Sequence, residues 1–302
     1  MSTVTLITPC FNGENHLDNY IKGLLSQTAS NVEYIFINDG STDNTKNIIL
    51  SYKKDFLDKG WTFQYLEQEN SGQASAINKG LQIMTGDYFS CIDSDDILMP
   101  NYFEKMSNYL STNSDVDMVF PVAEIVKEKT LEHICYRSRK INQNLVDTIF
   151  EDVLLANENL PVFASFMIRT KTFEKLNPFK QIYQGLSGQN PQFILPIAYN
   201  GKVSYLDDCL IKIVFRENSD SHTNLKDKTY NWEYLYTETL KTIPNMPEYE
   251  KAYYFQKIKE RFSLKRLKII EREKYKRVSF NILGIKFKIK IPKWYKQLSN
   301  YT

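Results

Sequence analysis

The chain has 302 residues, of which 42% are hydrophobic and 25% charged, and its formal net charge is +2. This is the composition of an ordinary globular protein with a sizeable core, so it excludes a disordered or fibrous chain. A net charge so close to zero gives no global case for nucleic-acid binding, although residues 251–296 are locally rich in Lys and Arg.

The four cysteines are far apart and form no CxxC pair, which argues against a zinc site or a disulfide framework. The chain starts directly with a strand-like run instead of a secretory signal, and no window reaches the ~18 apolar residues that a membrane-spanning helix needs. We therefore expect a cytoplasmic protein in a reducing compartment, attached at most to the inner surface of the plasma membrane.

The first hundred residues alternate between short apolar runs and amphipathic helical patterns. The predicted strands are residues 4–8, 32–37, 63–67 and about 88–92, and the predicted helices are 16–28, about 43–56 with Ser41 or Thr42 as N-cap, and 73–84. This alternation predicts βαβ units, and hence a mostly parallel sheet with helices on both faces. In such sheets ligands bind beyond the carboxyl ends of the strands.

Polar clusters follow three of these strands: Pro9 to Asn12, Asp39, and the acids Asp93, Asp95 and Asp96. Three acids within four positions are costly to hold together unless a cation meets them. Their hard oxygen atoms suit Mg²⁺ or Mn²⁺ bound together with a phosphate. The alternative is a solvated acidic turn that caps the next helix, but the convergence of three polar loops on one edge favours a ligand site.

The loop after the first strand excludes two other nucleotide-binding folds. It contains a single glycine, Gly13, whereas a dinucleotide fingerprint needs the pattern GxGxxG at this place. A Walker phosphate loop is absent from the sequence as well.

Four motifs in register over about residues 3–110 resemble family 2 glycosyltransferases: residues 8–14, 37–43, 70–80 and 93–96. The resemblance implies the GT-A fold, an open α/β nucleotide-diphospho-sugar domain, and inversion at the transferred sugar. It implies a GT-A domain over residues 1–222, with a nucleotide-binding half (1–110) and an acceptor half (111–222). A helical and basic extension would follow over residues 223–302.

The resemblance also implies roles for individual residues. The implied nucleotide-sugar contacts are Pro9, Asn12, Glu14, Asp39, Asn70, Gly72, Asn78, Asp93 and Ser94. The implied ligands of Mg²⁺ or Mn²⁺ are Asp95 and Asp96, with His222 as a third ligand or else as an ordinary surface histidine. The metal would neutralise charge on the departing nucleoside diphosphate. The arginine that the family often has in the third helix is replaced by Ile77.

The family places an acidic general base at the start of a later helix, and here that place holds amides. Gln189, Asn190 and Gln192 occupy it, and an amide can position a hydroxyl but cannot deprotonate it. We therefore predict that these amides contact the acceptor. The base would then be Asp207, Asp208 or Asp152, or deprotonation would occur late and need little help.

The second half of the chain is less regular. The predicted strands are 117–122, 162–169, 202–206 and 210–215, and the predicted helices are 102–110, the end of 141–157, 194–198, 231–240 and 248–273. Residues 278–291 alternate Lys with Ile and Phe, which predicts a hairpin turning near Leu283-Gly284. With one apolar and one cationic face it would suit an anionic bilayer, and the alternative is an edge strand blunted by lysines.

We expect a metal-dependent inverting glycosyltransferase of bacterial surface-polysaccharide synthesis. It would move a sugar from a nucleotide donor, a UDP-hexose, to a glycan or polyprenyl-lipid-linked acceptor. The alternative is a non-catalytic nucleotide- or glycan-binding relative, because the acid before the later helix is missing. A nucleotidyltransferase would need a glycine-rich basic loop after the first strand, which is absent.

Overall fold

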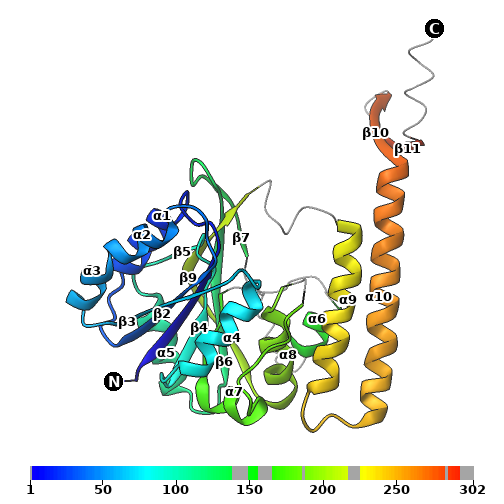
Figure 1. The fold of residues 1–302 in the computed structure, drawn as a ribbon. Coiled ribbons are helices and arrows are strands. Elements are labelled where there is room, and N and C mark those ends of the chain that lie inside the picture. Colours follow the sequence, from blue (N-terminus) through cyan, green and yellow to red (C-terminus); the bar gives the residue numbers. More distant parts are fainter. Residues whose placement is uncertain are drawn as a thin grey trace.

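The computed structural model describes residues 2–137, 149–155, 165–185, 188–216, 225–282 and 285–292. A curled sheet lies between helices, and two long helices, α9 (Leu225–Thr242) and α10 (Glu248–Lys274), stand side by side at its flank (Figure 1). The strands are β1 (Val4–Cys10), β2 (Val32–Asp39), β3 (Thr62–Gln68), β4 (Tyr88–Cys91), β5 (Ile97–Leu98), β6 (Met118–Lys127), β7 (His133–Arg137), β8 (Met167–Arg169), β9 (Val203–Phe215), β10 (Tyr275–Ile282) and β11 (Ile285–Pro292). The remaining helices are α1 (Leu17–Leu25), α2 (Thr45–Ser51), α3 (Lys53–Asp58), α4 (Gln73–Ile83), α5 (Tyr102–Thr112), α6 (Ile149–Leu155), α7 (Thr170–Leu176) and α8 (Asn190–Asn200).

The main sheet has the strand order β3-β2-β1-β4-β8-β6-β9-β5, with β7 paired to β6. Strands β3, β2, β1 and β4 are mutually parallel, whereas β8 runs antiparallel to both β4 and β6. This confirms the predicted βαβ units. It also brings the carboxyl ends of the first four strands to one edge, where ligands of such sheets bind.

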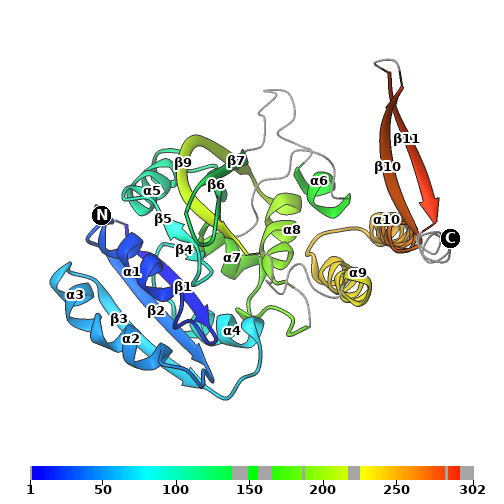
Figure 2. The same ribbon diagram turned by 90° about the horizontal axis from the view of Figure 1, so that it is seen from above.

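Apolar side chains fill both faces of the sheet. Leu6 of β1 packs with Tyr20 and Phe103 on the face covered by α1, α3 and α5, while its neighbour Ile7 belongs to the opposite core. That second core lies under α4, α7 and α8 and continues into α9 and α10 through Leu240 and Phe262. The view from above shows the two long helices end-on beside α8 (Figure 2). The helical part of the extension therefore shares a core with the α/β unit.

Strand β1 continues through Pro9 to Cys10, so the predicted break at Pro9 is wrong. The residues of β1 whose N–H groups face β4 are the odd-numbered ones, since the N–H of Ile92 bonds to the carbonyl of Ile7. Among the residues that face β4, Pro9 is thus the first one after Ile7, which makes the last hydrogen bond to that side. Its missing N–H falls where the pairing of β1 with β4 has ended, while the pairing with β2 continues to Cys10, and the strand tolerates it there.

The helix predicted to follow Ser41 or Thr42 begins later, at Thr45, and is divided into α2 and α3 at Tyr52. The carboxylate of Asp43 accepts the backbone N–H of Thr45 at 3.0 Å and its hydroxyl at 2.5 Å. The hydroxyl of Ser41 is used elsewhere, because it accepts the backbone N–H of Asn12 at 2.9 Å. The local N-cap prediction failed because the hydroxyls of Ser41 and Thr42 bond to Asn12 in the loop after β1.

Two further predictions change in the second half. The two strands predicted over residues 202–215 form one strand, β9, which runs parallel to β6 with register shifts around Val122. The strand predicted over 162–169 is described only from Met167, as β8, because residues 156–164 lie outside the described part. Residues 138–148 lie outside it as well.

The tail forms the predicted hairpin. Strands β10 and β11 pair antiparallel, with Ile282 opposite Ile285. The register sets Val278 opposite Ile289 and Arg277 opposite Lys290. None of the helices in the described residues is long and apolar enough to cross a membrane.

Candidate active site

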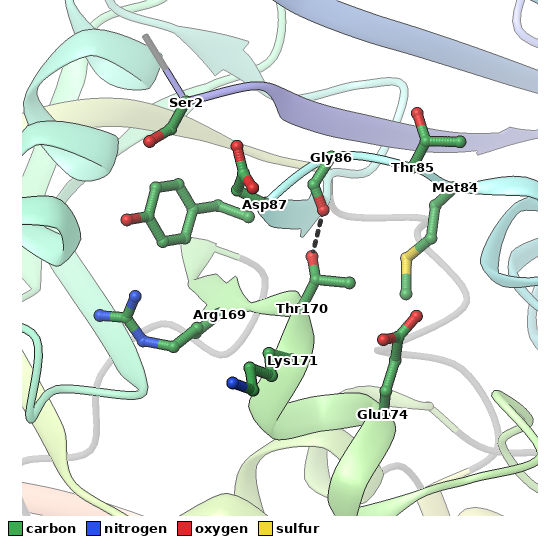
Figure 3. A pocket seen from close by; sticks show the side chains of 10 residues that line it. Ser2, Met84, Thr85, Gly86, Asp87, Arg169, Thr170, Lys171 and Glu174 are labelled. Carbon is green, nitrogen blue, oxygen red and sulfur yellow. Dashed lines mark hydrogen bonds between the residues drawn. The ribbon is translucent and has the colours of Figure 1, made fainter.

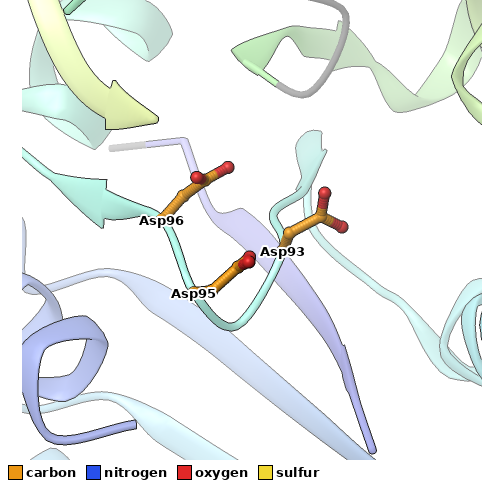
Figure 4. Close-up of side chains that lie close together, drawn as sticks. All are labelled: Asp93, Asp95 and Asp96. Carbon is orange, nitrogen blue, oxygen red and sulfur yellow. The ribbon is translucent and has the colours of Figure 1, made fainter. Parts of the chain in front are cut away.

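Three carboxylates lie together on the turn that follows β4 (Figure 4). Each of Asp93, Asp95 and Asp96 offers an oxygen, and these oxygens all lie within 4.8 Å of one another. Strand β4 is buried between β1 and β8, so the sheet itself fixes the turn at its carboxyl edge. The acids predicted from the sequence to form one cluster do so.

Burial makes this cluster unfavourable without a cation. Asp96 is only 3% exposed, and one of its oxygens accepts the backbone N–H of Val214 at 3.2 Å. Burial, and then the neighbouring charge of Asp95, raise the pKa of Asp93 to about 7. The same two causes raise the pKa of Asp96. Raised carboxyl pKa values mean that the fully ionised cluster is disfavoured until positive charge arrives.

Part of that positive charge comes from the chain itself. Arg216, the residue after β9, forms an ion pair with Asp95 through its Nη2 atom. The Nε atom of the same guanidinium is buried without a hydrogen-bond partner among the described residues. Leaving a buried donor unpaired costs about 1–3 kcal/mol, so this guanidinium is poised to bind a further acceptor.

The acids fit a hard divalent cation. Carboxylate oxygens are the ligands that Mg²⁺ and Mn²⁺ prefer, and such ions are usually held by one or two carboxylates plus substrate phosphates. Asp95 is more available to a cation than Asp96, because its partner among the described residues is the side chain of Arg216, which can move away. His222, the predicted third ligand, lies outside the described residues.

The loops after β1 and β2 are joined by the side chains predicted to line the nucleotide cleft. The Oδ1 atom of Asn12 accepts the N–H of Thr42 at 2.9 Å, and the carboxylate of Glu14 accepts the N–H of Asn44 at 3.3 Å. Asn12 adopts a left-handed backbone conformation with φ of 50°, which asparagine tolerates better than most residues. Pro9 is buried in β1 behind this wall. Nucleotide contacts by Pro9, Asn12 and Glu14 stay a prediction.

Asp39 fixes the loop between β3 and α4. It is 3% exposed, and its carboxylate accepts the N–H groups of Ser71 and Gly72, each at 2.9 Å, and the amide of Gln68 at 2.7 Å. Gly72 has φ of +87°, a conformation that favours glycine, and it precedes α4. Asn70 is exposed beside it. Asp39 thus fixes the loop between β3 and α4, while its contact with the nucleotide sugar stays a prediction.

Two site residues were missed by the sequence reasoning. The amide of Gln73, the first residue of α4, donates to Asp93 at 2.5 Å. The Nε2 atom of His16 lies 3.3 Å from the hydroxyl of the buried Ser94, and burial lowers the pKa of this histidine. Both follow polar motifs that the sequence does show, but their partners lie 20 and 78 positions away. Only the tertiary packing of α1 beside β5, and of α4 on β1 and β2, brings these partners together.

Two predicted ligand contacts have a structural task. The side chain of Asn78, predicted to contact the nucleotide, donates to the carbonyl of Ile182 at 2.8 Å and accepts its N–H at 2.7 Å. Gln192, predicted to contact the acceptor, accepts the N–H of Tyr183 at 2.6 Å and donates to its carbonyl at 3.1 Å. These amides fix the segment that leads into α8. Their direct ligand contacts stay predictions.

The candidates for acceptor activation are spread out. Gln189 is buried as the N-cap of α8, and Asn190 is the first residue of that helix. Asp207 lies seven positions before Val214, the residue of β9 that touches Asp96, and at ~3.3 Å per residue this is roughly 20 Å along the strand. Asp208 pairs with Lys105, and Asp152 lies on α6. The structure therefore does not bring Asp207 to the acids.

A cavity of about 380 Å³ lies at the other edge of the sheet (Figure 3). It is lined by Ser2, Tyr88 and Arg169 among others, and the hydroxyl of Thr170 donates to the carbonyl of Gly86 at 2.6 Å within it. Tyr88 is the first residue of β4, whereas the acids follow its last one. This cavity is therefore separate from the acidic cluster.

Comparison with known proteins places the chain in a family. The family model Glycosyl transferase family 2 matches residues 5–176, more than half of the chain. The glycosyltransferase GlyA of Streptococcus pneumoniae is 32% identical over 158 residues, 48% of this chain and 22% of that protein. A protein of Rickettsia prowazekii described as uncharacterized glycosyltransferase RP339 is 38% identical over 136 residues, 44% of this chain and 40% of its own length.

This chain thus spans less than half of the length of these two curated relatives. Among solved structures, S. aureus TarS 1-349 in complex with UDP-GlcNAc superposes with a TM-score of 0.66 at 16% identity, covering 90% of this chain and 76% of that one. This likeness shows that the fold is the GT-A fold. With the family match, the four motifs and the acids at the carboxyl edge, the chain belongs to glycosyl transferase family 2.

Proposed function

We propose that the chain is a metal-dependent inverting glycosyltransferase that uses a nucleotide-diphospho-sugar, a UDP-hexose, as its donor. The observation that carries this proposal is the cluster of Asp93, Asp95 and Asp96 at the carboxyl edge of a family 2 fold. Support for UDP comes from TarS, whose structure was solved with UDP-GlcNAc and with UDP. The acceptor would be a glycan or a polyprenyl-linked glycan of bacterial surface-polysaccharide synthesis, in line with the bacterial relatives.

In this proposal the acids after β4 and the residues around them bind the diphosphate of the donor. Asp95 and Asp96 would hold Mg²⁺ or Mn²⁺, which as a Lewis acid neutralises charge on the leaving diphosphate. Arg216 now pairs with Asp95, and with Asp95 engaged in holding the cation its guanidinium would be free to pair with the diphosphate. Gln73 would keep Asp93 oriented toward the donor throughout.

The acceptor side depends on positioning. Gln189 and Asn190 can orient an acceptor hydroxyl by hydrogen bonds but cannot take its proton. Attack by this hydroxyl on the side opposite the leaving diphosphate gives inversion in one displacement. Proton loss would then follow bond formation and pass to solvent. The rate would rest on alignment and on stabilisation of the leaving group.

The first test is donor turnover. We would incubate the protein and Mn²⁺ with a panel of UDP-, GDP- and dTDP-sugars and measure release of the nucleoside diphosphate, with and without lipid-linked acceptors. We expect release from one donor, and a loss of at least about 100-fold in Asp95→Ala. Asp115→Ala is the matched control, since Asp115 is a surface acid paired with Lys202 outside the site.

The alternative function predicts a different result. A non-catalytic relative would bind UDP in a metal-dependent way and release nothing from any donor under any acceptor. Asp95→Ala would then weaken UDP binding alone. This outcome would refute the transferase and assign the missing acid at Gln189 and Asn190 a functional consequence.

We also propose that the hairpin of β10 and β11 holds the enzyme at an anionic membrane surface. Lys286, Lys288 and Lys290 alternate with apolar residues along β11, and the segment before the hairpin is basic as well. Clusters of this kind gain about 1 kcal/mol per Lys or Arg near an anionic leaflet. Such an attachment would bring the cleft to a lipid-linked acceptor.

A further inference from the structure

A second cavity, of about 640 Å³, lies between the amino-terminal end of α4, residues 183–185 and α9. In the view from above, α4 and α9 stand on either side of the chain that leads into α8 (Figure 2). Its volume falls within the range of about 300–1,000 Å³ that is usual for small-molecule sites. The loop between β3 and α4, which Asp39 fixes by hydrogen bonds, also lines this cavity. None of the described lining residues is Asp93, Asp95 or Asp96.

The lining of this cavity is aromatic and amidic. The rings of Tyr183 and Tyr234 lie with their centroids 5.6 Å apart and their planes at 59°, and the two side chains are 41% and 52% exposed. The carboxamides of Asn70, Gln184 and Asn231 add donors and acceptors, and Leu235, 1% exposed, belongs to the buried core beneath. None of the described residues that line it is acidic or basic.

The exposed Tyr183 is held unusually firmly for a loop residue. Gln192 of α8 bonds to both its N–H and its carbonyl, and Asn78 of α4 does the same to the preceding Ile182. Both amides are almost fully buried, at 9% and 7% exposure. Two helices thus fix the backbone that presents the ring, and a pre-organised ring loses little entropy when a ligand covers it.

We propose that this cavity is an acceptor subsite that binds a neutral glycosyl unit. A sugar ring offers an apolar C–H face to a tyrosine and hydroxyls to carboxamides, and the lining supplies both kinds of partner. A phosphate or carboxylate would lose hydration here without meeting a cation. The lining residue Tyr183 is bonded to Gln192, which lies on the same helical turn as Gln189 and Asn190, so the cavity adjoins the helix predicted to contact the acceptor. The inference rests on the proposed transferase.

The test is binding of neutral glycosides to the full chain, without any donor. Saturation-transfer NMR would be recorded with the methyl glycosides of glucose, galactose, mannose, rhamnose, N-acetylglucosamine and N-acetylgalactosamine. We expect transfer to at least one glycoside, a reduction of at least tenfold in Tyr234→Ala, and retention in Tyr234→Phe, which keeps the ring. Asn231→Ala gives a second variant, which removes from the lining a carboxamide that would bond to a sugar hydroxyl.

The control is Tyr249→Ala, because Tyr249 is 74% exposed on α10 and does not line the cavity. The dissociation constant of UDP with Mn²⁺ should change less than twofold in all four variants. Absence of transfer to every glycoside, or equal transfer in wild type and Tyr234→Ala, would overturn the subsite. So would a tenfold loss of UDP affinity in Tyr234→Ala, which would make the cavity part of the nucleotide site. Donor turnover is measured separately, so failure of the subsite and failure of the transferase are distinguishable.

Discussion

Two of the carboxylates after β4, those of Asp93 and Asp96, have raised pKa values, and their ionised forms destabilise the folded chain. Burial raises the pKa of Asp93 to about 7 from the ordinary value of 3.8, so the folded chain binds this proton more tightly than the unfolded chain. Its contribution to stability is therefore complete below about pH 4 and is lost as the pH rises through about 7. At neutral and higher pH the metal-free site is a source of strain that a cation would relieve.

We predict that Asp93→Asn stabilises the metal-free protein. An asparagine keeps the acceptor for Gln73 but carries no charge next to Asp95 and Asp96. In EDTA at about pH 8 the free energy of unfolding should rise by on the order of 2 kcal/mol. This is about half of the free energy that corresponds to the full pKa shift of Asp93, because its side chain is half-buried and solvent screens part of its charge. The gain should shrink toward about pH 4, and urea unfolding at several pH values measures it.

Mn²⁺ should stabilise the same variant less than it stabilises the wild-type protein, because one negative charge next to Asp95 and Asp96 is gone. A gain that did not depend on pH would contradict the assigned pKa. Arg216 shows the complementary behaviour, since it pairs with Asp95 while its own Nε has no hydrogen-bond partner in the part of the chain that the structure describes. A buried donor of this kind beside a cluster of acids is typical of a functional site.

At the scale of elements, α4 and α8 act together on the segment between α7 and α8. Each helix contributes one buried amide, Asn78 or Gln192, and each amide makes two bonds to the backbone of the segment. A buried backbone group without a partner costs about 1–3 kcal/mol, so these amides decide whether the segment is ordered.

We predict that Gln192→Ala lowers the free energy of unfolding by about 2–3 kcal/mol, because it leaves the N–H and the carbonyl of Tyr183 unpaired. Thermal unfolding should show a midpoint lower by several degrees. The glycoside signal should fall with it, since Tyr183 is released. Gln181→Ala, at an exposed amide in the same segment, should leave the unfolding midpoint and the glycoside signal unchanged. Equal effects of the two variants would refute the role of Gln192 in fixing the backbone of Tyr183.

At the scale of the molecule, the long helices carry the basic hairpin away from the sheet (Figure 1). The helices themselves are fixed to the α/β unit: Arg261 of α10 bonds to the carbonyl of Leu154 on α6, and Arg266 pairs with Glu233 of α9. The hairpin pairs only with itself among the described strands. Its backbone pairing therefore does not join it to the main sheet.

We predict salt-sensitive binding of the full chain to anionic vesicles. Co-sedimentation with phosphatidylglycerol vesicles should be strong at about 0.05 M salt and weak at about 0.5 M, because the Debye length shrinks with ionic strength. Changing Lys286, Lys288 and Lys290 to Gln should weaken it at least tenfold. The same change at Lys53, Lys54 and Lys171, three exposed lysines elsewhere, should have little effect. Undiminished binding of the hairpin variant would rule out this attachment.

The sequence by itself determined the frame of the protein. Short apolar runs and helical patterns predicted β1 to β4 and the helices between them, because these patterns report burial along a single element. The acids after β4 followed directly, since residues three positions apart on one turn must lie close together. The hairpin at the tail is equally local, with strands that meet across a short turn.

Only the tertiary structure decided which polar groups meet. Arg216 reaches Asp95 across 121 positions, and Asn78 reaches Ile182 across 104. Asp207 looked equivalent to other acids in the sequence, yet the single long strand β9 keeps it away from the cluster. The cavity between α4 and α9 has walls from segments about 110 and 50 residues apart. Such contacts depend on how helices pack on the sheet, and no pattern within one segment encodes the partner that packing will supply.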